Sequence, residues 1–538
     1  MFQLTAPLMS DAYKTYHPFA YKPGVSYAYE NFTNRSNKLS NIPEALEIGG
    51  VVHLGLQYVI KEFLIDRWNA TFFCVDKKKA VAKYSRMVNS VLGKKVPVGH
   101  IEALWDVGYL PIEIKALPEG TIVPYGVPPF TIKNTIPGFH WVPGLLETLL
   151  SAELWPMSTS ATTAFAYRKA FEKTPIAKEM IPFMGHDFSY RGMFGSMAAA
   201  MSGFGHLCSF VGSDTYPAAE FAEYFYNADV EKELVMASVD ATEHSVMCSY
   251  GTDGELESLR HLMTNVTPTG ILSVVSDTWD FWKLVGEYLP ALKDEIMARQ
   301  GTLVIRPDSG DPVDILCGLD YSDVDTIQQI TAEGIYLVQE TNEFIKVVKA
   351  NEHGLMKFEE ISQYEVKGLI ESLWDIFGGT YVEWAPVDEC YTYRPQSYKL
   401  LDSHIGAIYG DSITLERQRQ IHRKLMKKGF VPSVVLGIGS FTYQYVTRDT
   451  HGSAMKATSI VVNGERQAIA KDPKTDRKKK SAKGLIYVGR NDNGEIYMED
   501  EVSEAREAEG LLQPVFRDGK LLVETSLKEI RALLVSQL

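Results

Sequence analysis

Short apolar runs that stop at polar residues recur in the second half of the chain. Continuous apolar strands of this kind, alternating with helix-like stretches, are typical of a parallel sheet that is buried on both faces. In such folds ligands bind where the carboxyl ends of the strands meet. We therefore expect a binding site at the polar ends of these runs, which are Ser276-Asp277 after residues 271–275, Arg306-Pro307-Asp308 after 303–305, Gly410-Asp411 after 405–409, and Gly437-Ile438-Gly439-Ser440 after 434–436.

Other stretches show different patterns. Apolar residues recur at helical spacing over 51–64 and 366–377, and residues 526–538 predict a closing amphipathic helix. Residues 313–365 combine acidic turns with apolar patches. They contain no Gly or polar run that resembles the ends of the neighbouring strands. We interpret them as an inserted element. Residues 471–483 predict a basic, turn-rich loop.

Charge and composition narrow the function. The 538 residues carry a net charge of −14, which argues against a nucleic-acid or anionic-membrane binder because such proteins need a positive field. Any anionic ligand must be met by locally placed Arg and Lys. The five cysteines are scattered without a zinc spacing, and no apolar run is long enough to span a membrane. The first residues lack the pattern of a signal peptide, so we expect a cytoplasmic protein.

The strand end at 306–312, RPDSGDP, has the chemistry of a sugar-phosphate site. Asp308 and Ser309 place oxygen acceptors beside the guanidinium of Arg306, and Gly310 permits a close approach of the backbone. Ribose hydroxyls need hydrogen-bond acceptors, and phosphates need two or more N–H donors held side by side, as in a guanidinium group. A strand-to-helix turn with an internal salt bridge explains the same residues equally well.

Two further segments carry candidate binding groups. The run at 186–192, HDFSYRG, combines a cation, a carboxylate and two aromatic rings, which could stack on a flat heterocycle and bind phosphate, or could be a buried polar turn. Asp214 follows an apolar stretch. It is either a ligand-binding carboxylate or the cap of the helix that starts near Pro217.

Two other segments suit phosphate chemistry. His244 lies next to Glu243 and is a general base, a phosphate acceptor or simply a hydrogen-bonded structural residue. The GIGSF run at 437–441 could present backbone N–H groups to a phosphate at a helix start. No GxxxxGK[ST] motif occurs, which argues against a Walker-type nucleotide loop.

In this order the motifs resemble those of the nicotinamide phosphoribosyltransferases, in the class that includes the nicotinate and quinolinate enzymes. The resemblance covers nearly the whole chain, and the ordered set is far more specific than any one member. It is carried by SDAYK at 10–14, LPIEIKALPEG at 110–120, HDFSYRG, GSDT at 212–215, ATEHS at 241–245, SVVSD at 273–277, RPDSGDP, YGD at 409–411, TRD at 447–449, and KDP at 471–473 followed by SAKG at 481–484.

The resemblance implies an α/β fold with two domains. Residues 156–444 would form an irregular (β/α) barrel-like catalytic domain with an insertion at about 313–365. Residues 1–155 and 445–538 would form a second, α+β domain that contributes to a homodimer site.

The implied activity is that of a pentosyltransferase. It converts nicotinamide and phosphoribosyl pyrophosphate to nicotinamide mononucleotide and pyrophosphate in NAD biosynthesis, with ATP as a co-substrate. Mg²⁺ assists and is held mainly by the pyrophosphate, so no protein ligand is assigned to it. The pyridine nitrogen is already a nucleophile, so catalysis consists of alignment, charge stabilisation and support of the leaving group.

Matching positions imply roles for individual residues. Phe188 would stack on one face of the nicotinamide ring and Tyr13 of the partner subunit on the other, while Asp214 would accept a hydrogen bond from the carboxamide. His244 would be phosphorylated by ATP and oriented by Asp277. The other assignments are Arg191, Arg306, Asp11 and Ser273 to the ring and phosphate side, Asp308 and Asp411 to the ribose, Gly410, Gly439 and Ser440 to the 5-phosphate, and Arg35, Arg448, Lys456 and Lys471 to polyphosphate across the dimer.

The chain departs from the family pattern in three places. About fifty extra residues lie between Gly310 and Gly410, Ser189 replaces a glycine, and Ile438, Ser440 and Phe441 stand where smaller residues are usual. Three alternatives stay open. They are a nicotinate phosphoribosyltransferase, a non-catalytic binding protein on the same fold, and a metal-dependent hydrolase that uses His186, Asp187 and His244.

Overall fold

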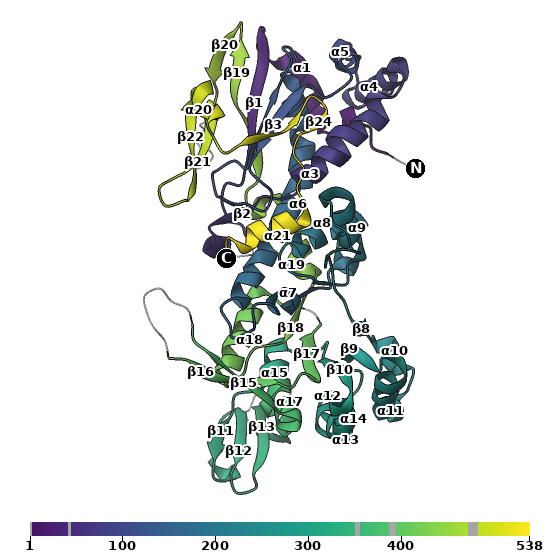
Figure 1. The fold of residues 1–538 in the computed structure, drawn as a ribbon, viewed down its shortest axis with the longest axis vertical. Helices are drawn as coiled ribbons and strands as arrows, with labels where there is room; N and C mark the ends of the chain where they lie inside the picture. Colours follow the sequence, from purple (N-terminus) through teal and green to yellow (C-terminus); the bar gives the residue numbers. More distant parts are fainter. Residues whose placement is uncertain (1–2, 41–44, 350–355, 387–393, 411, 472–481) are drawn as a thin grey trace.

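Two seven-stranded sheets organise the chain, one toward each end of an elongated molecule (Figure 1). The computed structural model describes residues 3–40, 45–349, 356–386, 394–410, 412–471 and 482–538. Asp411 and residues 472–481 of the basic loop lie outside the described residues. None of the described helices combines the length and the apolar character that crossing a bilayer requires.

The first sheet joins the two ends of the sequence. Its neighbouring strands are all antiparallel, and β1 (Val25–Thr33) pairs with β5 (Phe130–Asn134) on one side and with β19 (Ala454–Val462) on the other. The order is completed by β20 (Glu465–Ala468) beyond β19, and by β3 (Ile112–Ala116), β23 (Gln513–Arg517) and β24 (Lys520–Leu521) beyond β5.

The second sheet is parallel throughout, and it contains the four apolar runs that were predicted to be strands. The strands are not in sequence order, because the strand at residues 185–187 lies beside the one at 435–438, and the strand at 405–409 lies beside the one at 300–306. The strands in order are β7 (Gly212–Ser213), β6 (Gly185–Asp187), β18 (Val435–Ile438), β17 (Ile405–Tyr409), β10 (Gln300–Arg306), β9 (Thr269–Val275) and β8 (Asp240–Ala241).

One short segment connects the two edges of this sheet. Ala237 forms a parallel bridge with Gly212 of β7, and only three residues later Asp240 begins β8 and pairs with β9. The N–H of Ser213 donates to the carbonyl of Ala237 at 3.0 Å. The sheet therefore curls into a ring, and the predicted fold class of a barrel-like α/β domain packed with an α+β domain is confirmed.

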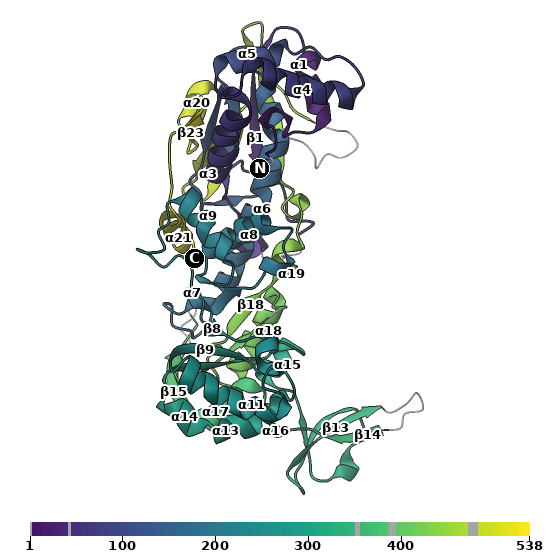
Figure 2. The same cartoon turned by 90° about the vertical axis from the view of Figure 1, so that its right-hand side faces the viewer.

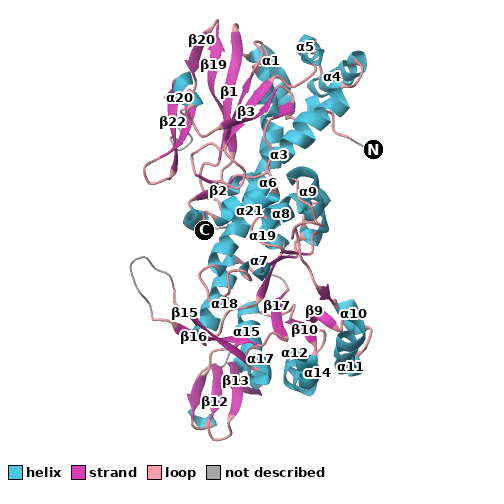
Figure 3. Cartoon of the chain, in the orientation of Figure 1, coloured by secondary structure: helices cyan, strands magenta, loops and turns pink. Residues whose placement is uncertain are grey.

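Helix α6 (Trp141–Phe171) joins the two sheets. Its first two-thirds pack in the hydrophobic core that contains Phe32, Ile112 and Phe130 of the first sheet. Its last turns pack in the core that contains Leu303 and Leu436 of the second. Figure 3 shows the helix running between the two groups of strands. At 31 residues it is about 45 Å long.

The other helices cover the outside of the two sheets. Their bounds are α4 (Lys77–Leu92), α5 (Gly99–Val107), α8 (Ser196–Leu207), α9 (Tyr216–Tyr226), α11 (Glu255–His261), α14 (Lys293–Ala298), α15 (Pro312–Cys317), α17 (Leu369–Phe377), α18 (Leu415–Lys427), α19 (Ser440–Gln444) and α21 (Leu527–Val535). The predicted C-terminal helix is present as α21, and it starts with a capping box between Ser526 and Glu529.

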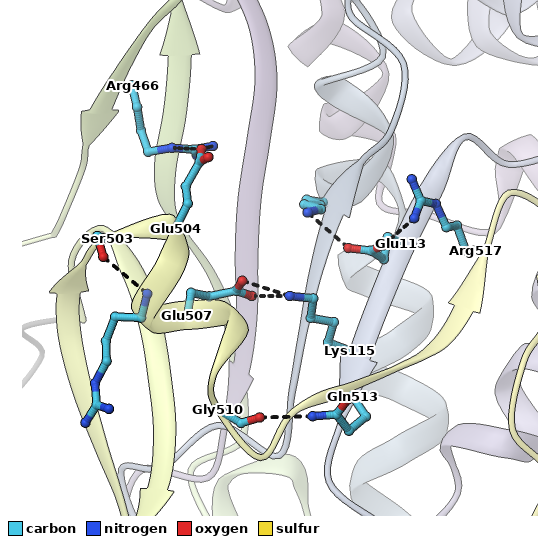
Figure 4. A network of polar contacts seen from close by, with 11 residues as sticks. Glu113, Lys115, Arg466, Ser503, Glu504, Glu507, Gly510, Gln513 and Arg517 are labelled. Atoms are coloured by element: carbon cyan, nitrogen blue, oxygen red, sulfur yellow. Dashed lines mark hydrogen bonds and ion pairs between the residues drawn. The ribbon is translucent and has the colours of Figure 1, made fainter.

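Polar contacts hold the C-terminal segment against the first sheet (Figure 4). Lys115 of β3 pairs with Glu507 of α20 (Glu504–Ala508) at 2.8 Å, and Arg466 of β20 pairs with Glu504 at 2.6 Å. The hairpin β21 (Leu485–Arg490) and β22 (Ile496–Val502) precedes α20. The two ion pairs thus fix α20 to one strand from the first part of the chain, β3, and to one from its last part, β20.

A small separate sheet lies within residues 313–365. It has the order β11 (Ser322–Val324), β12 (Gly334–Val338), β13 (Glu343–Lys349) and β14 (Met356–Glu360). Figure 2 shows it projecting to one side of the molecule, away from the ring. A second pair, β15 (Gly379–Trp384) and β16 (Gln396–Leu401), precedes β17.

The expected helix over 51–64 is wrong at its start. Val51 and Val52 belong to β2 (Gly50–Val52), which pairs with β4 (Ile122–Pro124), and helical structure begins only at Leu56. Both valines are fully buried, and β-branched residues suit a buried strand. Gly55 has a φ of 103°, which ends the extended segment.

Candidate active site

A cavity of about 380 Å³ lies inside the ring. Every strand of the second sheet contributes to its wall, because alternate residues of a strand point to the same side. Ile271 and Ser273 of β9 show this spacing, as do Val304 and Arg306 of β10. The other lining residues include His186, Phe188, Gly212, Asp214, Ser238, Ala241, Ile408 and Val435. The volume suits a small aromatic ligand.

Phe188 and Asp214 mark the polar end of this cavity. The ring of Phe188 lies 4.5 Å from that of His186, centroid to centroid. Asp214 Oδ1 is 3.0 Å from His186 Nε2 and accepts a hydrogen bond from Ser238 Oγ at 2.6 Å. Burial opposes ionisation of the carboxyl, but these hydrogen bonds and the charge of Arg306 outweigh it and lower the pKa of Asp214. The side chain therefore acts as a carboxylate acceptor.

Asp214 does not cap the helix that follows it. Helix α9 starts at Tyr216 with Thr215 at its N-cap, and no side chain caps it. The backbone N–H of Asp214 donates to the carbonyl of Asp187 at 3.1 Å, which holds the residue on the ring. Of the two readings of Asp214, the geometry favours the ligand-binding one.

Two buried polar groups on the cavity wall have no partner among the described residues. They are Ser273 Oγ and Arg306 Nε. The terminal nitrogen of the same guanidinium donates to the carbonyl of Thr242 at 2.6 Å, so Arg306 is held in place while Nε stays unpaired. Unpaired buried groups are costly, and a bound ligand is one way to satisfy them.

The ends of β8, β9 and β10 bring His244, Asp277 and Asp308 together. Nε2 of His244 lies 3.2 Å from Oδ1 of Asp277, and the N–H of Asp308 donates to Oδ2 of Asp277 at 3.1 Å. The Asp277 side chain is buried, while that of His244 is half exposed. One buried carboxylate thus fixes a surface histidine and the backbone of the RPDSGDP turn.

The predicted phosphate loops lie next to this group. A Cβ on Gly410 would come within 2.3 Å of Asp308 Oδ1, so any larger residue here would displace the Asp308 carboxylate. Gly439 and Ser440 lie where β18 passes into α19, and the N–H of Phe188 donates to the carbonyl of Ile438. Arg191 lies on the exposed turn η5 (Tyr190–Gly192), and Gly192 packs against Ser440.

The residues assigned to the partner site, and Asp11 with them, lie in the part of the molecule that contains the first sheet, and in one chain they do not line the cavity. Tyr13 is 62% exposed on η2 (Ala12–Tyr16), and the neighbouring Lys14 shares Glu147 with Lys456. Asp11 accepts from Thr148 Oγ1 at 2.8 Å, and Arg35 donates to the carbonyl of Gly452 at 2.9 Å. Arg448 begins η10 (Arg448–Thr450), and Lys471 follows β20.

Three site residues had no role in the predicted transferase site, although His186 had one in the hydrolase alternative. His186 and Ser238 hold Asp214, and Thr242 binds Arg306 through its carbonyl while its hydroxyl accepts from the N–H of Val275 at 3.0 Å. His186 and Thr242 lie within the HDFSYRG and ATEHS runs, so their motifs were visible. No sequence motif indicated Ser238, because its hydrogen bond to Asp214 depends on the bridge between Ala237 and Gly212 that closes the ring.

Among the described residues, no three His, Cys, Asp or Glu side chains converge as a metal-binding group. His186 and His244 contact different carboxylates, Asp214 and Asp277. The hydrolase alternative, which needs His186, Asp187 and His244 as one set, therefore has no geometric support.

A parallel ring that carries carboxylates and glycine-containing loops at the ends of its strands is suited to a phosphorylated sugar substrate. The model of the nicotinate phosphoribosyltransferase (NAPRTase) family matches residues 183–520. The chain belongs to this family, and it is a phosphoribosyltransferase.

Known proteins are similar over the whole length. The chain is 42% identical over 541 residues to a nicotinamide phosphoribosyltransferase of Acinetobacter baylyi, covering 98% of this chain and 96% of that one. Among solved structures it resembles nicotinate-nucleotide pyrophosphorylase from Pyrococcus furiosus, with a TM-score of 0.54, 15% identity, and 99% and 95% of the two chains covered. Human nicotinic acid phosphoribosyltransferase gives a TM-score of 0.50 at 15% identity, with 98% and 93% covered.

Proposed function

We propose that this enzyme transfers the phosphoribosyl group of phosphoribosyl pyrophosphate to nicotinamide, forming nicotinamide mononucleotide and pyrophosphate for NAD biosynthesis. The observation that carries the proposal is the set of polar groups around the cavity. Asp214 offers a carboxylate to the amide NH₂, while Ser273 Oγ and Arg306 Nε, both unpaired, can donate to the amide oxygen. Phe188 supplies a flat face for the pyridine ring.

The charge of Asp214 determines the choice between nicotinamide and nicotinate. Nicotinate would bring a second carboxylate to this position, and two like charges ~4 Å apart at an effective dielectric constant of ~20 repel by roughly 4 kcal/mol. That energy corresponds to about a thousandfold preference for nicotinamide. The lowered pKa of Asp214 supports the same conclusion, because the carboxylate stays charged.

The transfer step needs no general base. The pyridine nitrogen attacks the anomeric carbon with its own lone pair, the bond to pyrophosphate breaks, and the product carries the positive charge on the ring. Asp308, beside Gly410, is positioned to accept from ribose hydroxyls, and the loop at Gly439 to hold the 5-phosphate. We propose that Mg²⁺ is bound mainly by the pyrophosphate, with the family's charge-neutralising role.

We further propose that ATP drives the reaction through His244. Transfer of the γ-phosphoryl group to a ring nitrogen releases ADP, and hydrolysis of the phosphohistidine accompanies product formation. Asp277 supports this role because it holds one ring nitrogen of His244 and, through the N–H of Asp308, the ribose-binding turn. The negative charge added by phosphorylation of His244 would thus act, through Asp277, on the turn that holds the substrate.

A homodimer would complete the site. Tyr13, Arg35, Arg448, Lys456 and Lys471 would then come from the partner, from the part of the chain that contains the first sheet. The exposure of aromatic rings near the phosphate loop supports a covering partner, since Phe194 is 90% exposed and Phe441 stacks on Tyr445 in the open at 5.3 Å.

We expect the enzyme to work in the cytoplasm, where Cys74 and Cys248, both free and exposed, stay reduced.

The proposal is tested by offering the protein phosphoribosyl pyrophosphate and Mg²⁺ with nicotinamide, nicotinate or quinolinate, with and without ATP, and identifying the mononucleotide by mass. We expect nicotinamide mononucleotide in large excess, increased by ATP. Equal kcat/KM for nicotinate would overturn the assignment of Asp214, and no mononucleotide from any substrate would favour a non-catalytic binding protein.

A further inference from the structure

A second cavity, of about 270 Å³, lies outside the ring between α6, α18 and the short helix α2 (Ala45–Ile48). Its wall has one apolar part, formed by Ile48, Ala166, Ala170 and Met426. The lining residues of this cavity are distinct from those of the cavity inside the ring.

Four cationic side chains surround this cavity in a chain that is strongly acidic overall. Arg419 and Arg423 lie four residues apart on α18 and therefore share one helix face. Lys169 lies on α6 and Lys173 just beyond its last residue, Phe171, so positive charge reaches the cavity from both of its sides. Glu47 is the one carboxylate among the residues that line the cavity.

Glu47 occupies the position that an anion would take. Its Oε2 lies 3.1 Å from Arg419 and 3.8 Å from Lys173, and its backbone carbonyl accepts from Lys169 at 3.1 Å. Arg423 is held at 3.3 Å by Glu416, a residue outside the cavity lining. A single, half-exposed carboxylate therefore contacts two of the four cations, and a phosphate, with more charge and more acceptor oxygens, would bind them better.

The floor of the cavity contains an unpaired buried group. His422 is 6% exposed, and its Nε2 has no partner among the described residues. Burial lowers the pKa of His422 to about 3, against a smaller opposing effect of the Ala170 carbonyl, so the ring is neutral. A neutral imidazole beside a cation cluster can hydrogen-bond to a hydroxyl group of a ligand that also carries a phosphate.

From this arrangement we infer that the α6–α18 cavity is a binding site for a small phosphorylated sugar or nucleotide fragment, separate from the catalytic site. The two arginines form a fork for the phosphate, the lysines add charge, His422 meets a hydroxyl, and the apolar wall packs against the remainder. A cavity of this size can hold a pentose phosphate.

Ribose 5-phosphate is a suitable probe, with ribose and inorganic phosphate as partial ligands. Binding is measured on the full chain by hydrogen exchange of peptides covering 163–175 and 415–427, at increasing probe concentration. We expect ribose 5-phosphate to protect both peptides, phosphate to do so more weakly, and ribose not at all. The variant Asp308→Ala, altered in the proposed catalytic site, should keep this protection, which separates the inference from the proposed function.

Substitutions that remove a positive or a negative charge from the cavity test the contribution of these side chains to binding. Arg419→Gln with Arg423→Gln should weaken binding at least about tenfold, since each loses a charge-assisted hydrogen bond. Lys173→Gln, just beyond the end of α6 and largely exposed, should weaken it several-fold without affecting folding. Glu47→Gln should tighten binding several-fold by removing the competing carboxylate. Lys427→Gln, on α18 but outside the cavity lining, should change nothing.

The inference is overturned if ribose 5-phosphate protects neither peptide in the wild-type chain. It is also overturned if the protection persists undiminished in both Lys173→Gln and the double arginine variant, or if Glu47→Gln weakens binding, since the cations would then serve only to anchor α2.

Discussion

Oδ1 of Asp277 lies 3.2 Å from Nε2 of His244, at the point where β9 ends and α10 (His244–Cys248) begins. The same carboxylate accepts the N–H of Asp308. Asp277 is therefore the link between the histidine proposed to carry a phosphoryl group and the turn proposed to hold the ribose.

Replacing His244 by Ala should abolish the stimulation of turnover by ATP while leaving the fold intact, because the side chain is half exposed and packs little. Turnover is measured with and without ATP, and the fold is checked by thermal unfolding. If ATP stimulates the variant as much as the wild type, His244 is not the phosphoryl acceptor.

Asp277→Asn should reduce the same ATP stimulation and, in addition, raise KM for phosphoribosyl pyrophosphate. The second effect follows because the amide disturbs the hydrogen bond to the Asp308 backbone, at a cost of about 1–3 kcal/mol for a charged acceptor. Asp280→Asn is a matched control, since Asp280 caps α12 (Phe281–Lys283) and takes no part in the site. A variant that loses only ATP stimulation would show that Asp277 does not support the ribose turn.

Asp214→Asn should lower the preference for nicotinamide over nicotinate by at least about tenfold, by removing the repulsion of the nicotinate carboxylate. In the wild type the preference should be flat from about pH 6 to 8, because the lowered pKa of Asp214 keeps it charged throughout. The ratio of kcat/KM values for the two substrates measures both effects. A preference that falls as the pH drops across this range would contradict the assignment.

Phe188→Ala should raise KM for nicotinamide about tenfold through the lost stacking surface, and Phe188→Tyr should restore it. If stacking is shared across a dimer, mixing Phe188→Ala with Tyr13→Ala chains should recover part of the activity that neither has alone, because a mixed dimer contains one intact site. Failure of the mixture, with dimers demonstrated by sedimentation, would assign Tyr13 to its own chain's surface.

Glu30 predicts a pH dependence of stability. Burial, with a smaller contribution from Glu147, raises the pKa of Glu30 from 4.5 to about 7, and Lys14 and Lys456 oppose this only in part. A carboxyl group whose pKa is raised on folding stabilises the protein fully below about pH 4.5, and this stabilisation is lost as the pH rises through about 7. Glu30→Gln should therefore be more stable than the wild type by about 3 kcal/mol above pH 7 and about equal to it near pH 4.5. Denaturant unfolding at several pH values measures the difference, and parallel curves would refute it.

The local patterns in the sequence were sufficient for four of the seven ring strands, β9, β10, β17 and β18, but not for the short strands β6, β7 and β8. The runs before Asp277, Asp308 and Gly410 are strands as expected, because continuous apolar segments with polar ends leave few other solutions. The helix expected over 51–64 failed at Val51 because a short buried strand and a buried helix share the same apolar composition. Asp214 could be singled out by its motif, but its hydrogen bonds to His186 and Ser238, 28 and 24 residues away, depend on how the strands pair around the ring, which no local pattern reveals.

The position of β1 in the first sheet also affects how the chain is made. Val25 to Thr33 are synthesised early, yet one side of this strand pairs with β19, more than four hundred residues later. During translation that edge has no partner, while the ring between residues 185 and 438 can already assemble. Exposed strand edges promote aggregation, and pairing across such distances is slow. The nascent N-terminal segment is therefore the part of this enzyme that most needs protection by chaperones, and C-terminal truncations should aggregate even when they retain the complete catalytic ring.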